Sequence, residues 1–181
     1  MVETSDEWIR ERTGIGERHV SVGETVVTLA SEATRKALEQ AGKRAEEIDL
    51  ILVATCSPEQ YLPCCACQVQ AAVGAVNALA FDVNAACSGF LFALNTADAY
   101  LRTGLAENAL VIGSEVLSKL VDWKDRGSCI LFGDGAGAVV VATEVQVFQC
   151  EGFLALLCRT TETRRILSSS IKERPRFFHS C

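Results

Sequence analysis

The residue with the clearest chemical potential is Cys87, which lies where two kinds of sequence pattern meet. Residues 81–90 read FDVNAACSGF, so a predicted strand ends, the chain turns through small residues and a helix begins at about Cys87. A thiol at a helix N-terminus faces unpaired N–H groups and the positive end of the helix dipole, which favour the nucleophilic thiolate. Small neighbours such as Ala85, Ala86 and Gly89 leave room for a substrate carbonyl, and the Cys87 N–H could form half of an oxyanion hole. The pattern indicates a nucleophile, although a buried structural cysteine would give the same local sequence.

The elements around Cys87 can be predicted from the spacing of apolar residues. Helical spacing predicts helices over residues 26–41, 64–73 and 88–103. Short apolar runs predict buried strands over residues 50–54, 78–83, 110–113 and 138–142. Residues 1–22 are polar and turn-rich. Helices that alternate with short buried strands indicate an α/β fold with a mainly parallel sheet.

Composition and charge exclude several classes of protein. The chain has 181 residues, of which 49% are hydrophobic, enough for one domain with a core. The net charge of −6 argues against nucleic-acid binding, which needs an excess of Lys and Arg on some face. No run approaches the roughly 20 apolar residues of a membrane span, and the acidic start does not resemble a signal peptide. We therefore expect a soluble cytoplasmic protein whose nine cysteines are reduced and mostly buried.

The character of the chain changes near Val145. Residues 146–181 carry more Lys and Arg than Asp and Glu, lack clear periodicity and end in RFFHSC. We therefore predict two parts, a globular α/β part over residues 1–145 and a separate tail over residues 146–181.

Four stretches together resemble the β-ketoacyl-acyl carrier protein synthase III family. They are residues 4–9 (TSDEWI), 12–15 (RTGI), 81–90 (FDVNAACSGF) and 132–138 (FGDGAGA), in the order and at the spacing of that family. The resemblance covers roughly residues 3–144. It implies a thiolase-like fold, in which two related α/β halves stack as a five-layered αβαβα sandwich, and this chain matches the N-terminal half.

The resemblance also implies a reaction and its participants. An acyl-CoA loads Cys87, malonyl-acyl carrier protein decarboxylates, and its carbanion attacks the thioester in the Claisen condensation that initiates fatty-acid synthesis. The resemblance implies no cofactor and no metal, and acyl-CoA enters the reaction as a substrate. The full-length family implies a homodimer.

Further site residues follow from the same resemblance. Trp8 and Arg12 resemble the pair that stacks on the adenine of CoA, Arg126 resembles another CoA contact, and Thr4 is a further candidate. An indole and a guanidinium can stack on a purine, and Arg can meet phosphate. The ordinary alternatives are a tryptophan that anchors a loop and arginines in surface ion pairs.

Two further residues are assigned by the resemblance to the acyl pocket. Leu62 matches a bulky residue that reaches the pocket of a partner subunit and bears on chain-length choice. Phe132 matches an aromatic residue of the pocket region.

The chain departs from the family pattern in its second half. That half supplies a His and an Asn, in HQAN-like and NTS-like motifs, which stabilise the carbanion oxygen, and neither motif occurs here. Of the two histidines, His19 matches a non-catalytic position and His179 lies in no matching context. We therefore expect that this chain alone does not complete the condensation but can be acylated at Cys87. A truncated or frame-altered gene product, or an incomplete sequence, would show this pattern.

The sequence allows four other interpretations. Cys64, Cys65 and Cys67 could bind a soft metal, although zinc usually takes four ligands at recognisable spacing. The glycine-rich residues 133–137 fit a tight turn better than a dinucleotide fingerprint, because a strand and not a helix follows. The chain could be an inactive association module that pairs through the strand edge near residues 78–81. Other thiolase-superfamily enzymes, such as polyketide or hydroxymethylglutaryl-CoA synthases, fit the first two motifs less well.

Overall fold

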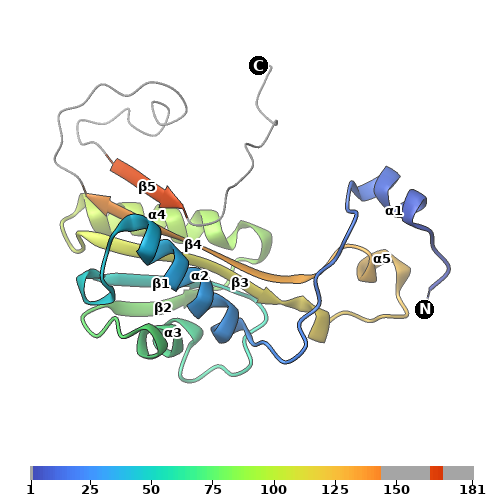
Figure 1. The fold of residues 1–181 in the computed structure, drawn as a ribbon, viewed down its shortest axis with the longest axis horizontal. Helices are drawn as coiled ribbons and strands as arrows, with labels where there is room; N and C mark the ends of the chain where they lie inside the picture. Colours follow the sequence, from blue (N-terminus) through green and yellow to red (C-terminus); the bar gives the residue numbers. More distant parts are fainter. Residues whose placement is uncertain (1, 144–163, 169–181) are drawn as a thin grey trace, which may run out of the picture.

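The centre of the molecule is a five-stranded mixed sheet. The computed structural model describes residues 2–143 and the backbone of residues 164–168. The strands are β1 (Leu50–Ala54), β2 (Leu79–Val83), β3 (Asn108–Val116), β4 (Asp134–Thr143) and β5 (Arg164–Ser168). Their order is β2-β1-β3-β4-β5 (Figure 1). β1 pairs in parallel with β2 and β3, whereas β4 pairs antiparallel with both β3 and β5.

Helices cover both faces of this sheet. The helices are α1 (Asp6–Thr13), α2 (Val26–Ala41), α3 (Cys65–Val73), α4 (Gly89–Arg102) and α5 (Arg126–Cys129). Short 3₁₀ turns lie at Ala45–Glu47, Ala86–Ser88 and Leu117–Lys119. α2 and α3 pack on one face and α4 on the other, while α1 and α5 lie away from the sheet (Figure 1). None of the helices within the described ranges is long and apolar enough to cross a bilayer.

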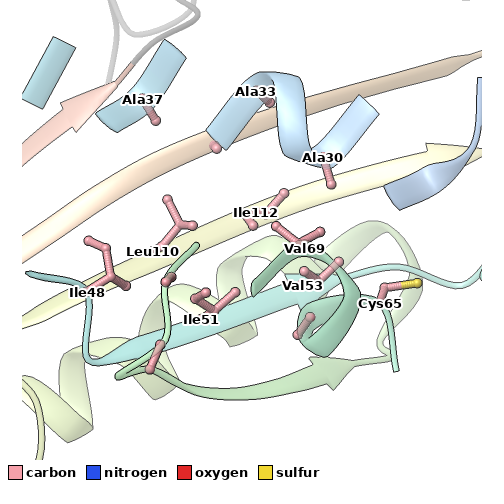
Figure 2. Packing of buried hydrophobic residues seen from close by; sticks show 14 of the residues in the cluster. Ala30, Ala33, Ala37, Ile48, Ile51, Val53, Cys65, Val69, Leu110 and Ile112 are labelled. Carbon is pink, nitrogen blue, oxygen red and sulfur yellow. The ribbon is translucent and has the colours of Figure 1, made fainter. Parts of the chain in front are cut away.

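The core sits on both sides of the central strands. Side chains of a strand alternate between its faces, so Ile51 and Val53 point toward α2 and α3, while Leu50 and Leu52 point toward α4. Small residues let the helices approach closely. Figure 2 shows how Ala30, Ala33 and Ala37 of α2 and Val69 and Cys65 of α3 meet the strand residues. Two covered faces explain why the strands are continuous apolar runs.

The predicted helices and strands of the globular part are confirmed. Residues 26–41 and 50–54 have the predicted bounds, and the other helices differ by one or two residues. α2 begins after Thr25, whose hydroxyl accepts the Thr28 N–H, and ends at Gly42 in the left-handed conformation. β3 and β4 extend further than predicted, because their ends pair with each other outside the apolar runs.

Three expectations were wrong. The sheet is not mainly parallel, since its four strand pairs divide equally between parallel and antiparallel. The glycine-rich run does not form a tight turn: Gly135 and Gly137 belong to β4 and pair with Glu115 and Gly113. The polar N-terminal segment contains a helix, α1, of which Ile9 alone is buried. The predicted tail, apart from β5, lies outside the described residues.

Candidate functional site

Cys87 lies in a sharp turn that connects β2 to α4. The chain leaves β2 at Val83, makes a 3₁₀ turn over Ala86–Ser88 and enters α4 at Gly89. Ala86 has a φ of 46°, a left-handed conformation that costs an L-residue about 1–2 kcal/mol. Glycine at position 89 allows a close approach to β1, because a Cβ there would lie 3.2 Å from the Cβ of Ala54 and would force a small shift. Cys87 therefore lies at the N-terminal end of α4, as predicted, and it is exposed.

A pocket opens beside this thiol. It has a volume of about 420 Å³ and combines Cys87 with Phe132, Cys56 and Glu115. Its other lining residues are Ala54, Ala86, Phe90, Gly113, Ser114, Leu117 and Gly135. A mostly apolar pocket with a nucleophile at its wall suits an acyl chain. The pocket is open beside Gly135, since a Cβ there would meet no atom within 4 Å.

Glu115 organises the back of the pocket. Its carboxylate accepts hydrogen bonds from the Cys56 N–H at 2.8 Å, from the Thr55 hydroxyl at 3.2 Å and from the Ser57 hydroxyl. The Ser57 oxygen in turn accepts the Val116 N–H at 2.9 Å. These bonds fix the segment that follows β1 against the end of β3. Sequence reasoning missed Glu115, because a single acidic residue after an apolar run resembles an ordinary strand end.

The second cysteine of the pocket, Cys56, is a poor nucleophile. Burial, together with the hydrogen bond to Glu115 and the negative charge of Glu115, raises the pKa of the Cys56 thiol to about 11. Cys56 therefore stays protonated at neutral pH, and a thiol is a weak nucleophile. Sequence reasoning also missed Cys56, although it lies two residues after a predicted strand.

Trp8, Arg12 and Arg126 meet between α1 and α5, which project from the sheet (Figure 1). The guanidinium of Arg12 lies 4.3 Å and that of Arg126 4.6 Å from the centre of the Trp8 ring. Such contacts contribute about 0.5–1 kcal/mol each at exposed sites. Arg126 also donates to the Glu3 carbonyl at 3.2 Å, which joins α5 to the segment before α1. Three residues chosen on resemblance thus form one cluster, from segments more than 110 residues apart.

A cavity next to this cluster combines Arg126 with a further cation, Lys124. It is lined by Val2, Glu3, Lys124 and Arg126. Two cations at one cavity can attract phosphate groups. Lys124 was not predicted, although its position two residues before Arg126 was the available signal.

Two predicted residues lie outside both the Cys87 pocket and the cavity beside the Trp8 cluster. Thr4 is exposed just before α1, and neither cavity includes it. Leu62 is 86% exposed in the loop before α3 and does not line the pocket of this chain. The prediction for Leu62 concerned the pocket of a partner subunit, so it stays a prediction.

Comparison with known proteins gives a consistent result. The family model described as 3-oxoacyl-[acyl-carrier-protein (ACP)] synthase III matches residues 81–161. β-Ketoacyl-[acyl-carrier-protein] synthase III of Clostridium acetobutylicum is 57% identical over 141 residues, which is 78% of this chain and 43% of that protein. The protein of the same name from Streptococcus suis (strain 05ZYH33) is 51% identical over 185 residues, which is 99% of this chain and 55% of that protein.

A solved structure shares the fold. The crystal structure of 3-oxoacyl-[acyl-carrier-protein] synthase III from Aquifex aeolicus VF5 superposes with a TM-score of 0.78 at 52% identity, over 80% of this chain and 47% of that chain. This chain spans about half the length of the curated relatives that it matches. Over the matched part, about 80% of this chain, the sequence is that of a condensing enzyme of the β-ketoacyl-acyl carrier protein synthase III type, and the described residues form part of a thiolase-like fold.

Proposed function

We propose that this chain carries the acyl-accepting site of a β-ketoacyl-acyl carrier protein synthase III-type acyltransferase, with Cys87 as the nucleophile. The observation that supports this most directly is the exposed Cys87 thiol at the N-terminal end of α4, beside a mostly apolar pocket. The curated relatives named above carry the name of this enzyme. In this proposal the chain acts in the cytoplasm.

The first step transfers an acyl group to sulfur. The Cys87 thiolate attacks the thioester carbonyl of acyl-CoA, the carbonyl oxygen becomes an oxyanion, and the CoA thiolate leaves with the electron pair of the broken C–S bond. N–H groups at the start of α4, including that of Cys87, can stabilise the oxyanion. The acyl chain then extends into the pocket past Phe132. No cofactor is needed, because acyl-CoA supplies an activated acyl group.

The second step forms the carbon–carbon bond. Malonyl-acyl carrier protein loses carbon dioxide, its carbanion attacks the acyl carbonyl, and the Cys87 thiolate leaves. Groups must stabilise the carbanion oxygen, and the family uses a His and an Asn of its second half for this. We propose that this chain alone performs the first step and not the second.

CoA binding is assigned to the Trp8 cluster. The indole of Trp8 and the guanidinium groups of Arg12 and Arg126 offer stacking surfaces for adenine. Lys124 and Arg126 supply positive charge for phosphates at the adjoining cavity. Thr4 lies one residue from Glu3 of that cavity and remains a further candidate.

The dimer is a further part of the proposal. β2 has one neighbour, β1, among the described strands, and Leu79 at its start is 59% exposed. Pairing of β2 with the same strand of a second copy would cover this edge. The exposed Leu62 would then be available to the acyl pocket of the partner subunit.

Mass spectrometry tests the first step directly. The chain is mixed with acetyl-CoA and digested with chymotrypsin, which releases residues 82–90 with Cys87 as their single cysteine. The expected result is one acetyl group on this peptide and none on the peptides of the other cysteines. A folded preparation that stays unmodified at Cys87 would contradict the proposal.

The alternative of an inactive association module makes a different prediction. It rests on the exposed edge of β2 and needs no reactive thiol. Labelling of Cys87 by iodoacetamide that slows when acyl-CoA is present supports the enzyme site. Labelling that acyl-CoA does not affect, together with a stable dimer in solution, favours the association module.

A further inference from the structure

Two cysteines outside the Cys87 pocket lie in direct contact. Cys64 immediately precedes α3 and Cys67 lies in its first turn, and their sulfur atoms are 3.4 Å apart. Residues at i and i+3 share one side of a helix, so the spacing Cys-x-x-Cys places both thiols on the same side. Both residues are only partly buried, which leaves the pair accessible to a small reagent.

The surroundings hold the pair in place. Asp82 of β2 accepts the N–H groups of Cys65 at 2.9 Å and Ala66 at 2.7 Å, which fixes the first turn of α3 against the sheet. The Cys67 sulfur also lies 3.7 Å from the Ala80 carbonyl oxygen. The turn that carries the two thiols is therefore built into the fold and does not depend on a ligand.

Cys65 is separated from this pair. Its side chain is fully buried in the core cluster beneath α3 (Figure 2). Burial raises the pKa of the Cys65 thiol to about 12, and the charge of Asp82 acts in the same direction. The three adjacent cysteines thus consist of one buried thiol and one accessible pair.

This arrangement does not favour a metal. Among the described residues, no group of three or more His, Cys, Asp or Glu side chains is placed to hold a metal ion. A structural zinc site takes four ligands, and two thiols supply half of them. Chemistry that needs two thiols and no third ligand is thiol–disulfide exchange.

We propose that Cys64 and Cys67 form a reversible dithiol–disulfide site that exchanges with small-molecule disulfides of the glutathione type. A disulfide requires the sulfur atoms to approach to about 2.05 Å. For two residues one helical turn apart, rotation of the side chains can bring the sulfur atoms together without a rearrangement of the backbone. The site is independent of the acyl transfer proposed for Cys87.

The exchange is balanced in two steps. The hydrogen bond with Cys64, burial and nearby negative charge raise the pKa of the Cys67 thiol, which disfavours Cys67 as the first nucleophile. The Cys64 thiolate attacks R–S–S–R, forms Cys64–S–S–R and releases one R–SH. Cys67 then attacks the Cys64 sulfur, forms the Cys64–Cys67 bond and displaces the second R–SH. The protein loses two electrons and two protons, and the small disulfide takes up both.

The test measures the bond in the full chain. The protein is equilibrated with a series of ratios of reduced to oxidised glutathione, quenched with acid, alkylated with iodoacetamide in denaturant and digested with chymotrypsin. Cleavage after Tyr61 and Phe81 releases residues 62–81, which contain Cys64, Cys65 and Cys67 and no other cysteine. We expect this peptide to lose two hydrogen masses and carry one alkyl group, on Cys65, as the buffer becomes more oxidising.

Single substitutions identify the partners. Cys64→Ser and Cys67→Ser should each abolish the internal bond, whereas Cys65→Ala should preserve it. A peptide alkylated on all three cysteines at every ratio overturns the proposal. So does a bond that includes Cys65, or a glutathione adduct on Cys64 that Cys67 does not displace. Because CoA is absent throughout, the result is independent of whether Cys87 accepts an acyl group.

Discussion

The Cys87 pocket and the Trp8 cluster are constructed in different ways. The pocket residues lie at the ends of β1, β3 and β4 and at the start of α4, all of which belong to the sheet and its covering layers. The Trp8 cluster lies on α1 and α5, which project from the sheet (Figure 1). Its apolar support is the small group of Ile9, Cys129 and Ile130.

This difference separates two requirements. A nucleophile and an oxyanion site need atoms fixed to a fraction of an ångström, and a packed core gives that precision. A cofactor-sized ligand such as CoA needs a surface that can adjust when it binds, and short helices held by cation–π contacts allow this. The proposed function therefore places bond formation on the rigid region and substrate capture on the adaptable one.

The largest expected effect is that of Cys87→Ser. Because serine lacks a readily ionised sulfur, acetyl transfer from acetyl-CoA should fall by at least about 1,000-fold while the fold is retained. Transfer is measured by mass spectrometry of residues 82–90, and circular dichroism checks the fold. Cys64→Ser is the matched control, since Cys64 lies outside the pocket and should leave transfer unchanged. Equal loss in both variants would contradict the assignment of the nucleophile.

Core and projecting helices should differ in their effect on global stability. Leu110→Ala removes a fully buried side chain of β3 and should lower the free energy of unfolding by about 2–5 kcal/mol. Ile9→Ala removes the one buried side chain of α1 and should loosen α1 locally, with a global change below about 1 kcal/mol. Urea unfolding gives the global values, and amide hydrogen exchange gives the local one. Similar global losses for the two variants would show that α1 and the sheet unfold as one unit.

An intermediate effect is expected from Glu115→Gln. The amide keeps one acceptor oxygen but turns an N–H₂ group toward donors from Thr55, Cys56 and Ser57. Leaving such groups poorly paired should lower the free energy of unfolding by about 1–3 kcal/mol. Glu107→Gln, at an exposed position, is the control and should change it by less than about 0.5 kcal/mol. Equal stability of both variants would remove Glu115 from its positioning role.

A smaller effect on binding is expected from Trp8→Ala. Loss of the ring that contacts Arg12 and Arg126 should raise the acyl-CoA concentration for half-maximal acylation about 10-fold, with little change in the maximal acylation rate or in global stability. Trp8→Phe keeps a smaller ring, and its effect should fall between those of the wild-type chain and Trp8→Ala. Single-turnover acylation at increasing acyl-CoA concentration measures both the half-saturating concentration and the maximal rate. A fall in the maximal rate at an unchanged half-saturating concentration would assign Trp8 to the chemistry instead.

The same difference between regions explains what the sequence could predict. In the sheet and its covering helices, β1 is a continuous apolar run and α2 has apolar residues at helical spacing, so both were predicted with their bounds. α1 was missed because burial of Ile9 alone gives no periodicity. Its signals were local: Ser5 accepts the Trp8 N–H, acidic residues occupy the first turn, and Gly14 ends the helix in the left-handed conformation.

Pairing between strands far apart in the sequence was the other feature that local patterns could not predict. Gly135 and Gly137 look like turn residues when only their neighbours are considered, and their place in β4 follows from pairing with β3. The antiparallel direction of β4 also depends on the path of residues 117–133, which carries no apolar periodicity. Cys87 was found because its signal is local, whereas Glu115 and Cys56 became part of the site only when β1 and β3 were placed side by side.

Asp134 joins the segment between α1 and α2 to the start of β4 and gives the smallest expected effect. Its carboxylate accepts the Ser21 N–H at 2.7 Å, the Ser118 N–H at 2.8 Å and the Ser118 hydroxyl at 2.6 Å. Burial alone would raise the pKa of Asp134, but these hydrogen bonds outweigh it and hold the pKa below its ordinary value. The folded protein thus stabilises the charged carboxylate more than water does in the unfolded state.

The sign of the pH dependence follows from this lowered pKa. The folded-state pKa of Asp134 lies below the unfolded-state value of about 3.9, so its contribution to stability is present above that pH and is lost as the pH falls through the folded-state value. The difference in free energy of unfolding between the wild-type chain and Asp134→Asn should be constant from about pH 7 to pH 5 and shrink below about pH 4. Urea unfolding at each pH measures this difference. A difference that grows on acidification would mean that Asp134 is destabilised by its burial, and that the contact between the N-terminal segment and β4 must be held by the backbone bond from Asp134 to His19 instead.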